Sequence, residues 1–316
     1  FLCTSSFRVS RLIQLWLLIW AYSVVFGLMG ALTGVLQETA FDTYYLLTLL
    51  FPVTMGHYWF MTAYVFLYLL LPFVGMAVRD MTKRQMQAAL GILLVVFCVS
   101  KSVLPIRLEM DGQGYDCLWY LCVFLAAAYV RRFGVPFLER KGRGLLLYAG
   151  GCLLIFAGTF ALREVYLHTG GLDSRIKMCL EYNHILPFLA ALGLFGAFCR
   201  CKVPAKAAGI VNRIAPYTLG VYLLHENLGL RYTWQKWLGA ESLAAAVGNV
   251  DSGIGAVGSL LVWTAAAVLA VFCCGILVDV VRKGIFDGVH KVGRKMGWYR
   301  QLTAAIERAD ALFRQK

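Results

Sequence analysis

The hydrophobic positions of this chain gather in long runs that short polar segments separate. A helix needs about 20 mostly apolar residues to cross roughly 30 Å of bilayer hydrocarbon. By this criterion the pattern predicts eight transmembrane helices, of which the third and fourth are short. They cover residues 12–35, 58–78, 86–100, 116–130, 144–162, 183–199, 212–230 and 254–281.

One further apolar stretch, residues 44–55, is too short to cross a bilayer. Pro52 interrupts it, and a proline removes a hydrogen bond from the interior of a helix. We expect this segment to be re-entrant or to lie at the membrane interface.

The composition agrees with a membrane protein and argues against a soluble enzyme, a disordered tail or a fibrous repeat. Hydrophobic residues make up 60% of the 316 residues and charged residues 15%, against about 45–50% and about 25% in soluble domains. No soluble core of this size can bury so much apolar surface. We therefore predict an all-α, polytopic transmembrane bundle over residues 1–282.

The net charge of +13 reports topology rather than a nucleic-acid partner, because basic residues collect in the cytoplasmic loops of membrane proteins. The segment before the first predicted span and those after every even-numbered span carry 23 of the 30 lysines and arginines. Both ends of the chain are therefore predicted to be cytoplasmic.

Apolar residues also recur at helical spacing beyond Arg282, opposite a face of lysines and arginines. This pattern is typical of a basic amphipathic helix, which we expect on the inner leaflet as a cytoplasmic tail over residues 283–316. A coiled-coil seam is the alternative. Gly288, Gly293 and Gly297 weaken a helix here, and the run is only about four heptads long.

The ten cysteines do not predict a metal site. Most lie in or beside apolar runs, where cysteine behaves as a small hydrophobic residue. Cys199 and Cys201 come closest to a ligand pair, and no second pair accompanies them. We expect neither a metal nor a bound cofactor.

Polar side chains at membrane depth are costly, so each is a candidate for function. His225, Glu226 and Asn227 lie in the outer half of the seventh predicted span, and histidine is well suited to proton transfer near neutral pH. An interhelical hydrogen bond is the alternative role for this group. Arg231 is a candidate for binding substrate, or a side chain that reaches the interface.

Two further groups lie near the ends of predicted spans. Arg8 and Arg11 are three residues apart, so on a helix they share a face and can bind an anion together; anchoring at the cytoplasmic surface is the alternative. Tyr58 and Trp59 follow His57 at the outer end of the second span, where an aromatic belt is the alternative to a binding role.

Two acidic residues have local explanations. Asp116 precedes the fourth predicted span and is expected to cap that helix. Asp279 stands three and four residues before Arg282 and Lys283, and a local ion pair accounts for it.

Several of these stretches, taken in order, resemble the integral-membrane acyltransferase 3 family, bacterial O-acyltransferases that modify surface polysaccharides and related glycans. The matching pieces are Arg8 and Arg11 with Leu15 and Trp16, residues 57–73, residues 114–120 with 126–129, Tyr182 with Asn183, and residues 219–227.

The resemblance implies ten spans with both ends cytoplasmic, and a catalytic arginine and histidine in the first span. Because Phe1 corresponds to the stretch after the second family span, that histidine is expected upstream of it, and we expect the 316 residues alone to be inactive. Arg8 and Arg11 match an Arg-x-x-Arg implicated in the acyl-donor step. His225 and Glu226 match a segment assigned to the acceptor side, where they would shape the site or transfer protons.

The function expected from these observations is transfer of an acyl group, in the first instance acetyl, from cytosolic acetyl-CoA or another acyl-CoA. The acceptor would be a sugar hydroxyl of a surface or lipid-linked glycan, reached from a bacterial plasma membrane. Tyr58, Trp59, Asn227 and Arg231 would contribute to substrate binding beside the catalytic His225 and Glu226. A transporter or flippase of a lipid-linked glycan is the alternative, and a scaffold subunit of a polysaccharide-synthesis complex is a third interpretation.

Overall fold

The computed structural model describes residues 7–33, 42–104, 112–172, 175–231, 233–241, 243 and 253–313. Helices account for 81% of the structure, and these ranges contain no strand. The prediction of an all-helical protein is thus confirmed. The last two residues of the first predicted span lie outside the described residues.

The chain divides into two compact units. The first comprises Phe1–Phe7 with Ala63–Lys202, and the second comprises Arg8–Thr62 with Val203–Lys316. One of the three boundaries along the chain falls within a helix, α3 (Trp59–Asp80), whose first turn belongs to the second unit.

The first unit is a bundle of helices that includes α3 after its first turn. The other elements are α4 (Lys83–Leu94), a π-helical turn (Val95–Val99), α5 (Ser100–Val103), α6 (Cys117–Phe133), α7 (Pro136–Glu139), α8 (Arg143–Thr169), a 3-10 turn (Met178–Leu180) and α9 (Ile185–Cys199). Asp116 accepts a hydrogen bond from the Trp119 amide (2.9 Å) at the start of α6, which confirms its expected role as a cap.

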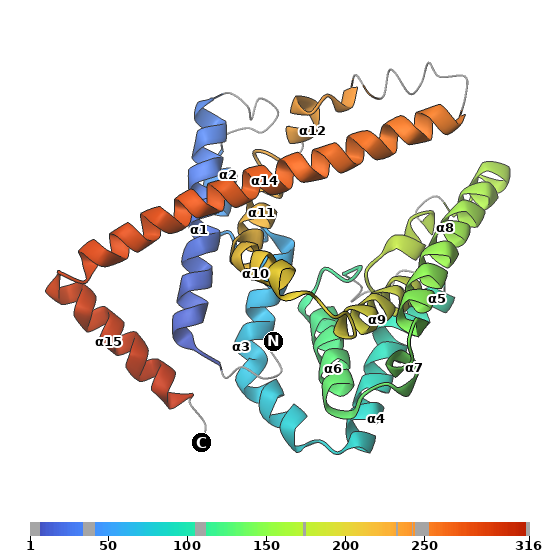
Figure 1. Ribbon diagram of the computed structural model, residues 1–316, viewed down its shortest axis with the longest axis horizontal. Helices are drawn as coiled ribbons and strands as arrows, with labels where there is room; N and C mark the ends of the chain where they lie inside the picture. The colour runs from blue at the N-terminus through green and yellow to red at the C-terminus, as the bar shows by residue number, and fades with distance from the viewer. Residues whose placement is uncertain are drawn as a thin grey trace. The chain divides into compact units, whose positions relative to one another are not determined.

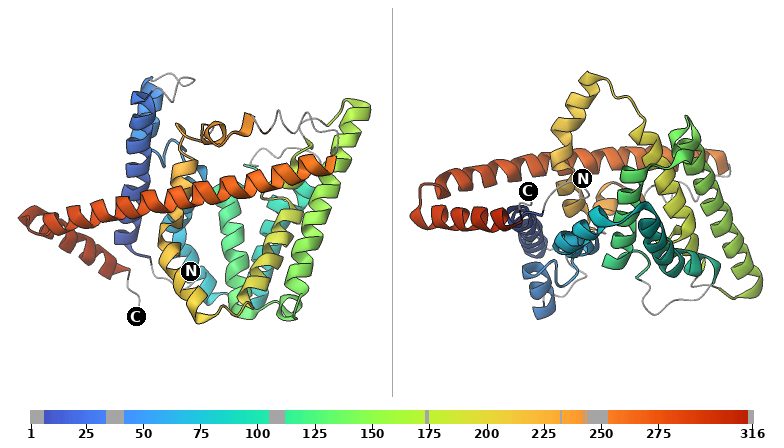
Figure 2. Two further views of the ribbon diagram at one scale, coloured as in Figure 1. Left: turned by 45° about the horizontal axis from the view of Figure 1, so that its top comes forward. Right: turned by 90° about the horizontal axis from the view of Figure 1, so that it is seen from below.

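The closest packing in the first unit is between α8 and α9, which lie side by side (Figures 1 and 2). A Cβ atom added at Gly144 would lie 2.7 Å from the Gly193 carbonyl oxygen, and one at Gly151 would lie 2.8 Å from the Ala190 Cβ. These contacts run in opposite order along the two helices, which are therefore antiparallel. Small residues allow two apolar helices to approach this closely in lipid, where dispersion contacts replace the hydrophobic effect.

The second unit is built around two long helices, α1 (Val9–Leu32) and α14 (Gly253–Gly293). Shorter elements complete it: α2 (Thr43–Leu50), α10 (Ala205–Ile214), a 3-10 turn (Ala215–Tyr217), α11 (Thr218–His225), α12 (Trp234–Trp237) and α15 (Gly297–Leu312). In Figures 1 and 2, α14 crosses α1 and α11, and α15 turns back from the end of α14.

Glycines bring α11 and α14 together. A Cβ atom at Gly220 would lie 2.5 Å from the side chain of Asp279, and one at Gly275 would lie 2.7 Å from the Cα of Val221. Each helix therefore presents a glycine where the other is bulkiest, and a larger residue at either position would push the two helices apart.

Within the residues that the structure describes, six helices are long and apolar enough to cross a membrane, rather than the eight expected. They are Val9–Leu32, Trp59–Asp80, Lys83–Val103, Arg143–Thr169, Met178–Cys199 and Gly255–Gly293. The predicted fourth and seventh spans are not among them, because α6 has 17 residues and α11 only 8. Pro216 lies in the 3-10 turn that separates α10 from α11.

The C-terminal boundaries also differ from those expected. Helix α14 continues without a break through Arg282 to Gly293, so the predicted end of the last span at residue 281 is not a helix end. The predicted amphipathic stretch is divided between the last turns of α14 and the separate helix α15, which begins at Gly297. Its position on the inner leaflet stays a prediction.

We expect the two ends of α8 to lie on opposite sides of the membrane. Single cysteines at the exposed positions Lys141 and Thr169, in a cysteine-free background, should react with an impermeant maleimide from opposite sides. These positions are preferable to the neighbouring Gly142 and Gly170, whose φ angles of 80° and 65° disfavour a side chain. Labelling of both cysteines from the same side would show that α8 does not cross the membrane.

Candidate active site

The first candidate group lies at the beginning of α1. Arg8 is the N-cap residue and makes no side-chain capping bond, so the first amides of the helix need another acceptor. Asp310 of α15 supplies it: its carboxylate accepts hydrogen bonds from the Ser10 amide (3.0 Å) and from the Ser10 hydroxyl (2.6 Å). A residue 300 positions away in the sequence thus caps α1.

The electrostatics of this helix end favour an anion. Burial opposes ionisation of Asp310, which is 6% exposed, but the hydrogen bonds from Ser10 and the charge of Arg8 hold the pKa of its carboxyl below the ordinary value. Arg8 is exposed and Arg11 half-buried on the same helical turn. Two guanidinium groups and a helix N-terminus together can hold a phosphate or a carboxylate.

The second candidate group lies where α11 ends. The Nδ1 atom of His225 is 2.9 Å from the carbonyl oxygen of Val221. Because a carbonyl can only accept, Nδ1 carries a proton, and in the neutral ring Nε2 has the free lone pair. Nε2 lies 3.6 Å from Glu226 Oε1, and the other carboxylate oxygen lies 3.4 Å from the Arg231 guanidinium. His225 therefore has the tautomer that a general base requires.

His225 also forms part of the wall of a cavity of about 390 Å³. Helices α1, α11, α12 and α14 contribute the other walls, and their side chains are apolar or aromatic. They are Phe26, Met29, Leu224, Leu230, Trp234, Trp237, Leu238, Ala270, Val271, Cys274 and Val278. A half-buried histidine beside an apolar cavity matches the general form of a ligand site.

Behind this cluster, a buried histidine joins three segments of the second unit. The Leu228 amide donates to His57 Nε2 (3.1 Å), so Nδ1 carries the proton and donates to the Ser23 hydroxyl (2.9 Å). Ser23 in turn donates to the Leu49 carbonyl oxygen (2.9 Å). Both ring nitrogens of the imidazole have a hydrogen-bond partner. This arrangement is typical of a histidine with a structural role in the core.

Asn227 makes a second set of buried hydrogen bonds in the segment that follows His225. Its amide nitrogen donates to the Tyr22 carbonyl oxygen (3.2 Å) and to the Tyr58 hydroxyl (2.9 Å), and its carbonyl oxygen accepts from the Gly229 amide (3.0 Å). Asn227 is 0% exposed and Tyr58 is buried. Both residues therefore fix the segment that follows His225. Their predicted contribution to substrate binding stays a prediction.

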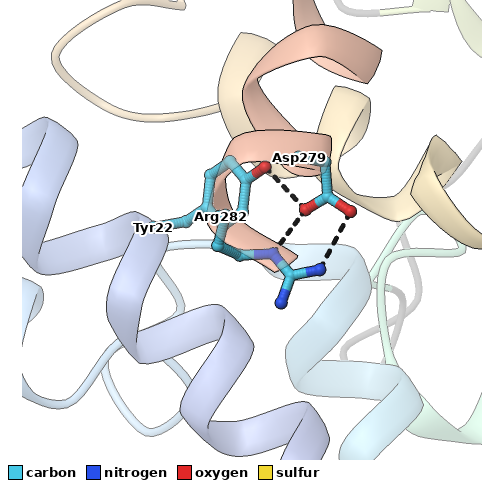
Figure 3. Close-up of polar contacts among 3 residues, drawn as sticks. All are labelled: Tyr22, Asp279 and Arg282. Atoms are coloured by element: carbon cyan, nitrogen blue, oxygen red, sulfur yellow. Dashed lines mark hydrogen bonds and ion pairs between the residues drawn. The ribbon is translucent and has the colours of Figure 1, made fainter. Parts of the chain in front are cut away.

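A third buried group links α1 to α14. The carboxylate of Asp279 accepts a hydrogen bond from the Tyr22 hydroxyl (2.8 Å) and two from Arg282 (2.6 and 3.0 Å), as Figure 3 shows. The expected ion pair between Asp279 and Arg282 is confirmed. Tyr22 was not predicted as a partner of Asp279, although Tyr22 and Ser23 form a polar pair in the middle of the first apolar run.

The predicted site residues thus fall into two groups in the second unit. Glu226 contacts both His225 and Arg231, and Trp59 is connected to His225 through the rings of Phe60 and Tyr222. Arg8 and Arg11 belong to the other end of α1, with Asp310. The tertiary structure does not bring the arginine pair to the histidine.

The first unit contains an ionisable cluster that the sequence analysis did not predict. Lys101 is buried in an ion pair with Glu181, and the Ser102 hydroxyl accepts a hydrogen bond from the Ile185 amide (2.9 Å). The signal in the sequence is a lysine at the end of the third apolar run. Among the residues that the structure describes, no group of three or more His, Cys, Asp and Glu side chains could hold a metal ion.

The fold and the site thus define a helical protein with helices of membrane-crossing length, a cationic helix end and a histidine beside an apolar cavity. A family model described as an acyltransferase domain, that of the acyltransferase 3 family, matches residues 4–279. The chain therefore belongs to this family, as the resemblance indicated, and the apolar helices agree with a multi-pass membrane protein. Neither the curated proteins nor the solved structures include a significant match.

Acidification should destabilise the second unit through His57. Burial lowers the pKa of His57 from 6.5 to about 4, and the nearby charge of Arg231 lowers it further. The unfolded chain takes up this proton at higher pH than the folded protein, so the contribution of His57 is complete above about pH 6.5 and is lost as the pH falls toward 4. The loss should reach about 3 kcal/mol of unfolding free energy.

The measurement is thermal stability in detergent between pH 7.5 and 4.5. His57→Gln, which keeps a hydrogen-bonding side chain, should lose less stability on acidification than the wild type. His168→Gln, at an exposed position of α8, should behave as the wild type. An equal loss in the wild type and in His57→Gln would show that His57 does not carry the effect.

Proposed function

We propose that the protein transfers an acyl group, acetyl in the simplest case, from a cytosolic acyl-CoA to a sugar hydroxyl of a surface or lipid-linked glycan. The observation that carries the proposal is the tautomer of His225. Its Nδ1 is bound to a backbone carbonyl, so that Nε2 can accept a proton beside Glu226 and at the wall of the cavity. The family assignment favours this reaction over transport of a lipid-linked glycan.

The reaction needs a base because a sugar hydroxyl is a weak nucleophile at neutral pH. His225 Nε2 accepts the hydroxyl proton while the oxygen attacks the thioester carbonyl. The resulting imidazolium is stabilised by the Glu226 carboxylate, and the Arg231 guanidinium provides positive charge for the developing oxyanion. When the C–S bond breaks, the CoA thiolate leaves and takes the proton from His225, which restores the starting state.

The donor would be held at the N-terminal end of α1. Acyl-CoA carries several phosphates. Because Asp310 already occupies the Ser10 amide, these phosphates would bind to the arginine side chains. Arg8 and Arg11 can add charge-assisted hydrogen bonds to a phosphate. The loop distribution of lysine and arginine predicts that this end of α1 is on the cytoplasmic side, where acyl-CoA occurs.

The two groups are far apart along α1. Tyr22, which contacts the segment after His225, follows Arg8 by 14 residues, or roughly 21 Å of helix. The phosphates of the donor therefore bind in one half of the membrane, and its thioester must reach toward the other. In this scheme the bundle lies in the plasma membrane of a bacterium, with α15 and both chain ends on the cytoplasmic side.

Removing the arginine pair should weaken donor use without unfolding the protein. In the full-length enzyme, Arg8→Ala and Arg11→Ala should each raise the KM for acyl-CoA about 10- to 150-fold, the equivalent of one lost charge-assisted hydrogen bond. Lysine should restore only part of the loss, because it cannot form a bidentate contact. Arg84→Ala, at an exposed cytoplasmic position of α4, is the matched control. Unchanged KM values in both alanine variants would assign these arginines to membrane anchoring.

His225→Gln separates proton transfer from packing. Glutamine keeps a hydrogen-bonding group of similar reach, so a chemical role for His225 predicts a loss of about 10²- to 10⁴-fold in turnover per folded molecule. The melting temperature in detergent should then change little. A role limited to helix packing predicts the opposite pair of results: nearly full turnover with a lowered melting temperature.

A further inference from the structure

The cavity at His225 is larger and more apolar than the transfer of an acetyl group requires. Its volume of about 390 Å³ lies within the range of about 300–1,000 Å³ typical of pockets for whole ligands. Cys274 behaves as a small hydrophobic residue, so His225 is the strongly polar exception among the described lining residues. Such a cavity suits a hydrocarbon chain whose polar end lies at the histidine.

The position of the cavity along α1 restricts where that chain comes from. Phe26 and Met29 follow Arg8 by 18 and 21 residues, or roughly 27–32 Å of helix. This distance equals the thickness of the hydrocarbon layer. The cavity is therefore at the opposite end of α1 from the arginines, and the charge distribution assigns that end to the outer leaflet.

The walls of the cavity agree with this depth. Trp234 and Trp237 belong to α12, in the segment between α11 and α14 that the sequence pattern predicts to be extracytoplasmic. Tryptophan rings favour the level of the lipid headgroups, where one side of the ring is apolar and the other meets water. A chain that enters here comes from the outer leaflet, whereas the donor arrives from the cytoplasmic side.

The polar groups beside the cavity can form hydrogen bonds with a sugar, whereas they would not favour a second apolar group. Glu226 and Arg231 are half-buried. The Glu226 carboxylate lies 3.6 Å from His225 Nε2 and 3.4 Å from the Arg231 guanidinium. A carboxylate accepts hydrogen bonds from hydroxyls, and a guanidinium donates to them. An amphiphile with an apolar chain in the cavity would thus have its first sugar at this cluster.

We propose that this cavity binds the hydrocarbon chain of a lipid-linked saccharide and so presents a sugar hydroxyl to His225. The inference rests on the proposed function and makes its acceptor specific. The acceptor is an outer-leaflet glycolipid rather than a finished, chain-free polysaccharide. Binding through the chain should also allow one site to accept different sugars, because most of the buried area belongs to the chain.

Photo-crosslinking of the full-length protein in nanodiscs of phosphatidylethanolamine and phosphatidylglycerol tests this site. The probes are alkyl β-glucosides of four, eight and twelve carbons that carry a diazirine at the end of the chain. We expect peptides that contain Met29, Trp234 or Ala270 to be labelled. Unlabelled alkyl glucosides should compete about fourfold better for each added CH₂ until the chain fills the cavity.

A pair of variants on α14 gives the matched control. Ala270→Phe adds a ring to the cavity wall and should reduce labelling by the twelve-carbon probe at least tenfold. Ala265→Phe adds the same ring at an exposed position of the same helix that does not line the cavity, and it should leave labelling unchanged. Melting temperatures of both variants show whether each is folded.

Three results would overturn the proposal. One is labelling that does not depend on chain length. A second is equal labelling by a diazirine phospholipid that alkyl glucosides do not displace, which would make the cavity a site for bilayer lipid. The third is labelling only by a long-chain acyl-CoA, which would assign the cavity to the donor.

The same experiment distinguishes this proposal from the proposed function, because crosslinking does not require turnover. Transfer of labelled acetyl groups in membranes without glucoside labelling would refute the cavity assignment and leave the acyltransferase in place. Specific labelling without transfer from any acyl-CoA would refute the acyltransferase instead.

Discussion

The second unit depends on the way in which one buried carboxylate is neutralised. Asp279 is 1% exposed, and a charge in an apolar environment persists only where other groups compensate it. Tyr22 from α1 and Arg282 from α14 do so with three hydrogen bonds. Removing one partner of such a buried pair typically costs about 3–5 kcal/mol. The carboxylate therefore fixes where α14 crosses α1.

Packing against α11 depends on the same residue. Gly220 lets α11 approach the Asp279 side chain so closely that no Cβ atom fits. The backbone of Tyr22 accepts a hydrogen bond from Asn227, only two residues beyond His225. The position of the candidate base is thus determined through a short chain of contacts that begins at Asp279. A site built in this way is rigid, which proton transfer between fixed partners requires.

The two ends of α1 have opposite chemical characters. At its beginning, Asp310 caps the helix amides beside two arginines, and the contacts are charged. Near its other end, Phe26 and Met29 help to line an apolar cavity. The proposed donor and acceptor sites therefore lie at opposite ends of a single helix of roughly membrane length. In the proposed reaction, this separation would require the acyl group to pass from one side of the bilayer to the other.

Much of this protein can be predicted from the sequence alone, because the bilayer requires long apolar helices and restricts charges. The all-helical class, the family, the cap at Asp116 and the ion pair between Asp279 and Arg282 all follow from local patterns. Spacing alone could not show that α11 stops at His225, or that α14 continues to Gly293. The end of α11 is followed by Asn227, whose buried hydrogen bonds join it to residues far away in the sequence. The pairing of Ser10 with Asp310, the bond of Tyr22 to Asp279 and the cavity beside His225 join residues far apart in the chain, so only the tertiary structure determines them.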